Sequence, residues 1–167
     1  MKRREFISLI GGAAAAWPLA ARAQQHEKMR RIGVLMNLTA DDVEGQGRLA
    51  AFLQGLQEAG WSVGRNVRVD LRWGAGDTEL YRSHAEELVA LAPDVILAAG
   101  AIVVLTLQRA SRTIPIVFAN AADPVGMGLV ASLARPGGNT TGFTIFEFSM
   151  GGKWLELLKQ IDRKSVV

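Results

Sequence analysis

The sequence contains no cysteine and only two histidines among its 167 residues. Without cysteine the chain forms no disulfide and offers no thiolate as nucleophile or metal ligand. Zinc is held chiefly by cysteine and histidine, so a zinc site also lacks its ligands. His26 lies near the N-terminus, and His84 stands at helical spacing with Leu80, Leu88 and Leu91. We therefore expect His84 to be a partly covered helix residue, and we expect no metal site.

Motifs of nucleotide-binding proteins and hydrolases are missing as well. The chain has neither a Gly-x-Ser-x-Gly elbow nor a Gly-x-x-x-x-Gly-Lys-Ser/Thr phosphate loop. Gly126-Met127-Gly128 supplies only the first part of a dinucleotide motif and does not directly follow a predicted strand. Asp41-Asp42 is similar to the acidic pocket of a receiver domain, but Gly100-Ala101 stands where the phosphorylated aspartate would be. We predict no catalytic residue, no cofactor and no enzymatic activity.

The positive charge of the chain comes from its first 23 residues. The whole sequence has 19 Lys and Arg against 16 Asp and Glu. Residues 1–23 hold four of these basic residues and one of the acidic residues, so 15 of each remain in the rest of the chain. No basic surface interleaved with aromatic residues is left, which argues against nucleic acid as a partner.

Residues 1–23 have the pattern of a cleaved signal peptide. Lys2, Arg3 and Arg4 precede the apolar run 6–16, and Ala21-Arg22-Ala23 places the expected cut before Gln24. The apolar run is shorter than the ~20 residues that cross a bilayer, so we expect no stable membrane span after cleavage. The mature protein is predicted to be periplasmic.

The export route is left open between two pathways. Arg3-Arg4-Glu5-Phe6-Ile7 resembles a twin-arginine (Tat) signal. A Sec signal also needs a basic start, and two adjacent arginines arise there by chance. Replacing both arginines by lysine would stop export by the Tat route only.

Apolar strands and amphipathic helices alternate along residues 24–144. The first predicted helix has an apolar face formed by Leu49, Phe52, Leu53 and Leu56, and Gly60 is its expected stop. The second is expected to begin after a cap at Asp77 or Thr78 and to carry Leu80, His84, Leu88 and Leu91 on one face. A third helix is expected over 102–111, and Asp123-Pro124 resembles the cap and first residue of a fourth. The predicted strands are 31–36, 67–71 near a sheet edge, 94–100, 115–120 and 141–144.

Strand-helix units of this length pair their strands in parallel through right-handed crossovers. The predicted fold class is therefore α/β, a doubly wound parallel sheet of about five strands. Such a sheet binds small molecules where the carboxyl ends of its strands meet helix N-termini, which offer N–H donors to an anionic group. The candidate ligand-binding residues there are Asn37, Leu38, Thr39, Gly100, Ala101, Ile102, Asn120, Ala121, Asp123 and Phe146. Structural roles explain some of them equally well: Asn37 closing a turn, Gly100 allowing close packing and Asp123 capping a helix.

Several blocks of sequence, in order, resemble the ABC-transporter solute-binding proteins. These blocks are 1–7, Gly60-Trp61-Ser62-Val63-Gly64-Arg65-Asn66-Val67, 93–98, 113–118, Asp123-Pro124-Val125-Gly126 and Ala134-Arg135-Pro136-Gly137-Gly138-Asn139-Thr140-Thr141-Gly142-Phe143. The resemblance implies a periplasmic binding protein of type I, in which two α/β lobes close on a small solute and present it to a membrane permease. Some relatives are linked to aromatic amino acids. Relatives often have Thr-Pro where this chain has Ala101-Ile102.

The resemblance also divides the chain. Residues 1–23 are the signal peptide, 24–144 the N-terminal lobe, and 145–161 the crossover and first helix of a second lobe that does not follow. The apolar face of that helix, with Trp154, Leu157, Leu158 and Ile161, then lacks its usual partner. The last six residues, 162–167, depart from the family pattern and match the translation of a sequencing adapter, GATCGGAAGAGCGTCGTGTAG, so we expect an adapter-derived tail on a truncated chain.

The expected function is that of the solute-binding component of an ABC importer, with a small solute such as an amino acid and a membrane permease as its partners. Two alternatives share the fold: an exported ligand-sensing module, and an exported α/β enzyme with its catalytic half missing. Hydrogen-bond donors at helix ends fit amino acids, organic acids and sugars alike. The sequence alone does not choose among these solutes.

Overall fold

The computed structural model describes residues 29–144 and 149–164. Five parallel strands form one sheet in the order β2-β1-β3-β4-β5, which confirms the predicted α/β fold class. The expected signal peptide lies outside the described residues. The elements are β1 (Arg30–Met36), α2 (Val43–Glu58), β2 (Val67–Trp73), α3 (Thr78–Ala90), β3 (Val95–Ala99), α4 (Ala101–Ala110), β4 (Ile116–Ala119), β5 (Thr140–Phe143) and α5 (Ser149–Lys164).

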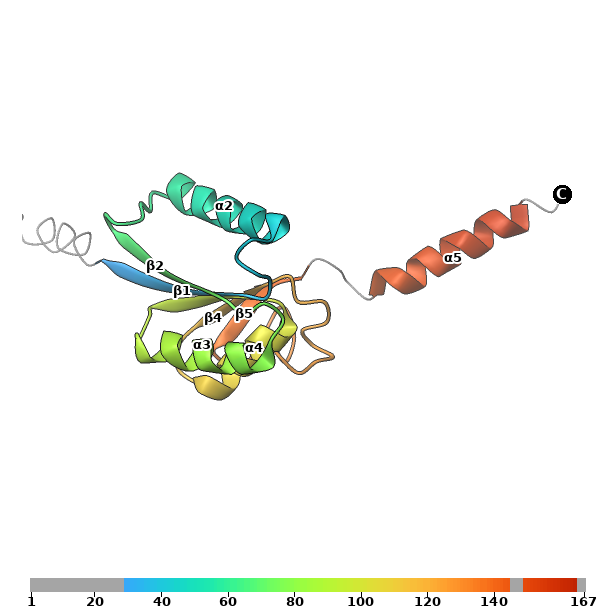
Figure 1. The fold of residues 1–167 in the computed structure, drawn as a ribbon. Coiled ribbons are helices and arrows are strands. Elements are labelled where there is room, and N and C mark those ends of the chain that lie inside the picture. The colour runs from blue at the N-terminus through green and yellow to red at the C-terminus, as the bar shows by residue number, and fades with distance from the viewer. Residues whose placement is uncertain (1–28, 145–148, 165–167) are drawn as a thin grey trace, which may run out of the picture.

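Helices lie on both faces of the sheet because its central strands are apolar on both sides. Side chains alternate along a strand, so Leu35 of β1 points to one face while Val34 and Met36 point to the other. Helices α3 and α4 cover the first face, and α2 lies over the second (Figure 1). The larger core, between the sheet and α3 and α4, includes fully buried Phe118 and Leu107.

The strand order reverses direction at the centre of the sheet. From β1 the chain steps to β2 at one edge, and from β2 it returns past β1 to β3 and then proceeds to β4 and β5. The prediction that 67–71 lies near a sheet edge is therefore confirmed. In open α/β sheets a ligand crevice forms where the strand order reverses, outside the carboxyl ends of the strands. Here that position lies between the ends of β1 and β3.

The C-terminus of α2 and the N-terminus of α3 match their sequence signals, Gly60 and Asp77. The Asp42 side chain caps α2 and accepts from the Gly45 N–H at 2.8 Å. Asp77 caps α3 and accepts from Glu79 N–H at 2.8 Å. At the end of α2, Gly60 has φ +86°, which a residue without a Cβ adopts readily.

The buried face of α3 differs from the predicted face. Tyr81, Ala85 and Leu88 are the buried residues of this helix, whereas Leu80 is 40% exposed. Placing Leu80 on the covered side was wrong because the aromatic ring of Tyr81, one residue further, packs against the sheet instead. His84 is partly buried, as expected.

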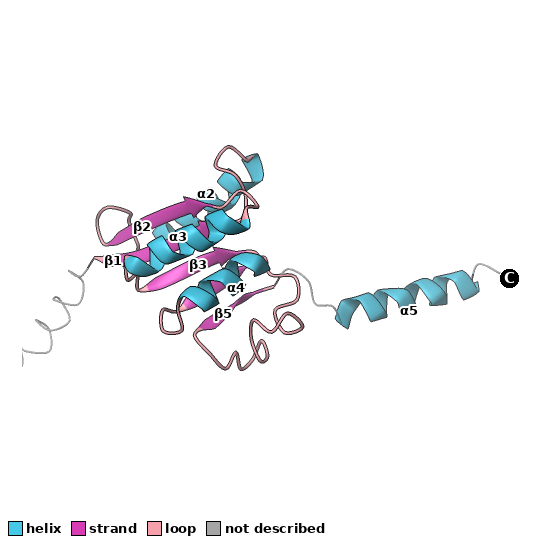
Figure 2. Cartoon of the chain, turned by 60° about the horizontal axis from the view of Figure 1, so that its bottom comes forward, coloured by secondary structure: helices cyan, strands magenta, loops and turns pink. Residues whose placement is uncertain are grey.

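The helix predicted after Asp123-Pro124 does not form. Asp123 does accept from the Gly126 N–H at 2.8 Å, but the chain continues as a turn over residues 124–128. Gly128 has φ +70°, which a right-handed helix does not contain. The long irregular connection between β4 and β5 is visible in Figure 2, and Gln108 of α4 anchors it by donating to the Leu129 carbonyl at 2.8 Å.

Helix α5 lies away from the sheet in both views (Figures 1 and 2). Its side chains over 151–161 are all exposed, including the apolar residues Trp154, Leu155, Leu157, Leu158 and Ile161. Within 29–144 and 149–164, no helix is both long and apolar enough to cross a membrane.

Candidate functional site

Three predicted residues follow the carboxyl ends of three neighbouring strands. Asn37 follows β1, Gly100 follows β3 and Asn120 follows β4. The strands are in register, with Leu35 beside Ala98 and Ala99 beside Ala119, so these residues come next to one another along one edge of the sheet. The Gly100 N–H donates to the Ala119 carbonyl at 3.1 Å, which extends the ladder by one bond.

The backbone of Asn37 is held from two sides, whereas its side chain carries an unused acceptor. Its carbonyl accepts from the Tyr81 hydroxyl at 3.1 Å and from the Gly76 N–H at 3.0 Å. Its side-chain Oδ1 is buried and has no hydrogen-bond partner. A buried acceptor without a partner costs about 1–3 kcal/mol, so a ligand donor at this position would gain that energy.

Gly100 occupies a position that disfavours other residues. Its φ is +93°, and a Cβ placed on it would lie 3.4 Å from Nδ2 of Asn37. A side chain here would therefore add backbone strain and narrow the space beside Asn37.

Helix α4 begins at Ala101, and its N-cap residue Gly100 provides no side-chain cap. The first N–H groups of a helix have no partner within the helix, and the helix dipole makes this end electropositive. Ala101 is half-buried, and Ile102 is 52% exposed. The start of α4 therefore offers backbone donors to an acceptor group beside Asn37 and Asn120.

The remaining predicted residues are placed differently. Leu38 packs against Gly45, where an added Cβ would lie 3.3 Å from the leucine Cβ. The exposed Thr39 hydroxyl binds Asp41 and holds the pKa of that carboxyl below its ordinary value. Ala121 is fully buried in the core, so only its backbone remains for a ligand. The Asp123 side chain caps the turn that follows it by accepting from the Gly126 N–H. Phe146 lies outside the described residues.

Arg48 and Glu44 of α2 join this edge, although the sequence did not single them out. Arg48 Nη2 donates to Glu44 Oε1 at 2.5 Å. The favoured orientation of the Asn120 amide turns Oδ1 toward Arg48, where it accepts from Nη1 and Nη2 at 2.9 Å each. The opposite orientation would set the amide NH₂ against donors only. The one advance signal was the i, i+4 spacing of Glu44 and Arg48, which is common on exposed helix faces.

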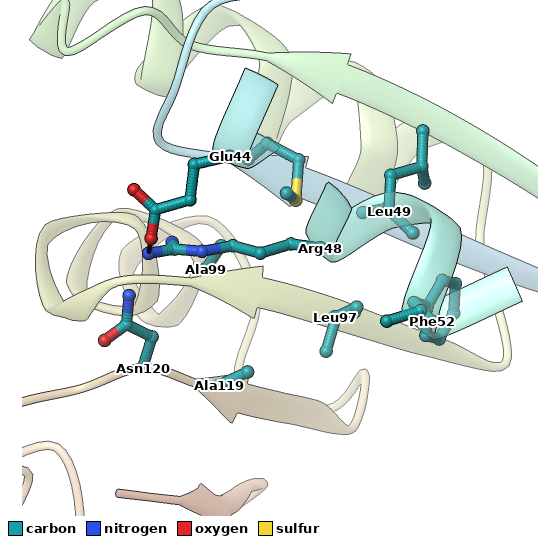
Figure 3. Close-up of a pocket in the computed structure, with 11 residues that line it drawn as sticks. Glu44, Arg48, Leu49, Phe52, Leu97, Ala99, Ala119 and Asn120 are labelled. Carbon is teal, nitrogen blue, oxygen red and sulfur yellow. Dashed lines mark hydrogen bonds and ion pairs between the residues drawn. The ribbon is translucent and has the colours of Figure 1, made fainter. Parts of the chain in front are cut away.

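A groove of about 520 Å³ runs beside α2 along the second sheet face, and Arg48, Glu44 and Asn120 lie at one end of it (Figure 3). Its other walls are apolar and come from the strands and α2: Val34, Met36, Leu49, Ala51, Phe52, Leu97, Ala99 and Ala119. The strand-end site thus borders an apolar surface.

The groups at this edge include both hydrogen-bond donors and an unused acceptor. Backbone donors of α4, the amide of Asn120 and the free acceptor of Asn37 suit a small polar molecule. In the part of the chain that the structure describes, no group of three or more His, Asp or Glu side chains is arranged to hold a metal ion.

Comparisons with known proteins show the family of the chain. The model of the family "ABC transporter substrate binding protein" matches residues 32–162. A tyrosine-binding protein of Clostridioides difficile (strain R20291) is 32% identical over 114 residues, which is 68% of this chain and 32% of that protein. This chain therefore spans about a third of the length of that curated relative.

Two solved structures share the fold. A conserved domain protein from Vibrio cholerae O1 biovar eltor str. N16961 matches with a TM-score of 0.68 and 29% identity, over 79% of this chain and 43% of that chain. An ABC domain from Streptococcus pneumonia in complex with L-Trp matches with a TM-score of 0.60 and 27% identity, over 70% of this chain and 39% of that one. The described sheet corresponds to one lobe of a periplasmic binding protein fold. The chain belongs to the ABC transporter substrate binding protein family.

Proposed function

We propose that this chain is the N-terminal lobe of the solute-binding component of an ABC importer. It holds one side of a small polar solute at the carboxyl ends of β1, β3 and β4, without chemical change to the solute. The observation that carries the proposal is the buried, unpartnered Oδ1 of Asn37 beside the uncapped start of α4. An acceptor and a set of donors at neighbouring strand ends suit a solute that has both kinds of group.

An α-amino acid has the required groups. Its carboxylate would accept from the N–H groups of α4 and from Asn120, and its ammonium group would donate to Asn37 Oδ1. The similar proteins that bind tyrosine and L-Trp favour an aromatic amino acid among the candidates. The apolar groove beside Arg48 adds surface suited to a ring.

Membership of the family supports a proposed location and a proposed partner. Substrate-binding proteins of ABC transporters act outside the cytoplasmic membrane and deliver their solute to a permease. Residues 1–23, with a basic start, an apolar run and the Ala21-Arg22-Ala23 site, supply a signal for export to the periplasm. The membrane permease of an importer is the proposed protein partner.

Calorimetric titration of the longest chain that the gene encodes tests the proposal. L-tyrosine and L-tryptophan are compared with tyramine, which lacks the carboxylate, and with desaminotyrosine, which lacks the amine. We expect saturable binding of the amino acids, weaker binding of both analogues, and recovery of unchanged amino acid by chromatography. Failure of both amino acids to bind, or recovery of a new product, contradicts the proposal.

Gly100→Ala is the matching site variant. It adds a Cβ at a φ of +93° beside Asn37 and should weaken amino acid binding. Gly47→Ala is its control, because no atom lies within 4 Å of a Cβ added at this glycine of α2. Equal affinities of the two variants would argue against the strand-end site.

A further inference from the structure

We propose that Arg48 is a positioning residue for solute binding: its guanidinium fixes the side-chain amide of Asn120 so that Nδ2 is presented as a donor at the strand-end site. The proposal rests on the proposed function, because Asn120 is one of the groups assigned to the solute. Arg48 itself acts through Asn120.

Arg48 bridges two parts of the fold that are distant in sequence. Its side chain extends from α2 across the end of β3 near Ala99 and reaches Asn120 at the end of β4 (Figure 3). Both Nη atoms donate to Asn120 Oδ1, at 2.9 Å each. Figure 3 draws the amide with its nitrogen toward Arg48; turning the amide by a half-turn replaces that donor-donor contact with two hydrogen bonds.

Glu44 holds the other side of the guanidinium. Its Oε1 accepts from Arg48 Nη2 at 2.5 Å. The Arg48 side chain is 32% exposed and the Glu44 side chain 69% exposed, so the arginine is the more enclosed member of the pair. The carboxylate offsets the positive charge of Arg48 and limits its rotation. Arg48 therefore serves as an oriented donor to Asn120.

The backbone of Asn120 is itself in an uncommon conformation. Its φ is +61°, in the left-handed region that residues other than glycine rarely adopt. Asparagine tolerates this region better than most residues, and a hydrogen-bonded side chain helps to hold it there. This backbone turn and the two bonds from Arg48 together set the direction of the amide.

The direction of the amide decides what it offers to a solute. With Oδ1 occupied by Arg48, Nδ2 faces the opposite side, where the neighbouring atoms are acceptors. Helix α4, whose first N–H groups are also donors, starts at the end of the neighbouring strand β3. A rotated amide would instead present Oδ1, which repels a carboxylate. Arg48 thus sets selectivity for solutes that bring an acceptor, such as the carboxylate of an amino acid.

Arg48→Lys is the decisive variant, because lysine keeps the charge but cannot donate from two planar nitrogens to one oxygen. Arg82→Lys is the matched control: Arg82 lies on the exposed surface of α3 and pairs with Glu79. Circular dichroism checks that both variants fold. If Arg48→Lys does not fold, Glu44→Gln is used in its place. This variant leaves both hydrogen bonds from Arg48 to Asn120 and only loosens the hold on the guanidinium.

The first measurement needs no solute. In ¹H–¹⁵N spectra of the ligand-free chain, Arg48→Lys should move the Asn120 side-chain NH₂ signals, whereas Arg82→Lys should leave them in place. Unmoved signals in Arg48→Lys overturn the proposal. This measurement does not depend on amino acid binding. A failure of the proposed function would instead be seen in the titration of the wild-type chain.

The second measurement is affinity for L-tyrosine and tyramine. We expect Arg48→Lys to weaken L-tyrosine binding about tenfold, the size expected for one lost hydrogen bond to a charged group, and to leave tyramine binding unchanged. A variant that only disturbed the fold would weaken both equally. Equal loss for the two compounds, or no loss for L-tyrosine, overturns the proposal.

Discussion

The Tyr81 hydroxyl donates to the carbonyl oxygen of Asn37 at 3.1 Å and thereby ties α3 to the end of β1. Tyr81 is buried, and its burial raises the pKa of the phenol. The ring also packs tightly on Gly74, where an added Cβ would lie only 2.2 Å from two ring carbons. The backbone of the candidate residue Asn37 is therefore held by a side chain of α3, on the sheet face opposite α2.

Tyr81→Phe is expected to reduce the free energy of unfolding by about 0.5–1.5 kcal/mol, because it removes this hydrogen bond and keeps the ring. Gly74→Ala should cost about 1–3 kcal/mol, because its methyl group cannot fit beside the ring. Urea unfolding of both variants measures these changes. Wild-type stability in Gly74→Ala would contradict the contact between Gly74 and Tyr81.

A second prediction concerns the N-cap of α3. Asp77 accepts from the N–H groups of Glu79 at 2.8 Å and Leu80 at 3.3 Å. Asp77→Ala should therefore cost about 0.5–2 kcal/mol. Thr78→Ala, one residue further on an exposed position, is the control and should stay within about 0.5 kcal/mol of wild type. Equal costs for the two variants would argue against the cap.

The elements that the sequence predicted well are those specified by local pattern. Alternating and continuous apolar runs located all five strands, and Asp77 and Gly60 marked helix ends because capping depends on nearby residues. The failed helix after Asp123-Pro124 carried the same kind of signal. There Gly128, with φ +70°, allowed the chain to leave the helical conformation after one turn.

The sequence placed the candidate site only as far as topology determines it. Asn37, Gly100 and Asn120 could be placed at one edge of the sheet because the ends of parallel strands meet there. Arg48 was not found, because its bond to Asn120 joins residues far apart in sequence and looks from the sequence like an ordinary exposed charge. Tyr81 was missed for a similar reason: its partner is a backbone carbonyl, which leaves no sequence signal.

A third prediction concerns acid stability. Glu87 accepts from Arg72 at 2.8 Å, and this hydrogen bond holds the pKa of Glu87 below its ordinary value. A carboxylate with a lowered folded-state pKa stabilises the fold above its unfolded pKa, and the contribution is lost as the pH falls through the folded value. Glu87→Gln should therefore be less stable than wild type near neutral pH, and the difference should vanish between about pH 5 and pH 3.

Urea midpoints across this pH range measure the effect. Glu86→Gln is the control, because Glu86 is an exposed carboxylate on the same helix. A difference between wild type and Glu87→Gln that is constant with pH would contradict the role of the pair with Arg72.

The last prediction concerns the exposed apolar residues of α5. Leu158 is 62% exposed on this helix, whereas Leu107 of α4 is fully buried. Because an exposed leucine adds little to folding, Leu158→Glu should change the free energy of unfolding by no more than about 0.5 kcal/mol, and Leu107→Ala should cost about 2–5 kcal/mol. Leu158→Glu should also improve solubility, since the apolar stripe with Trp154 and Ile161 is a surface prone to association. A large loss of stability in Leu158→Glu, measured by urea unfolding at low protein concentration, would mean that α5 packs against the sheet in solution.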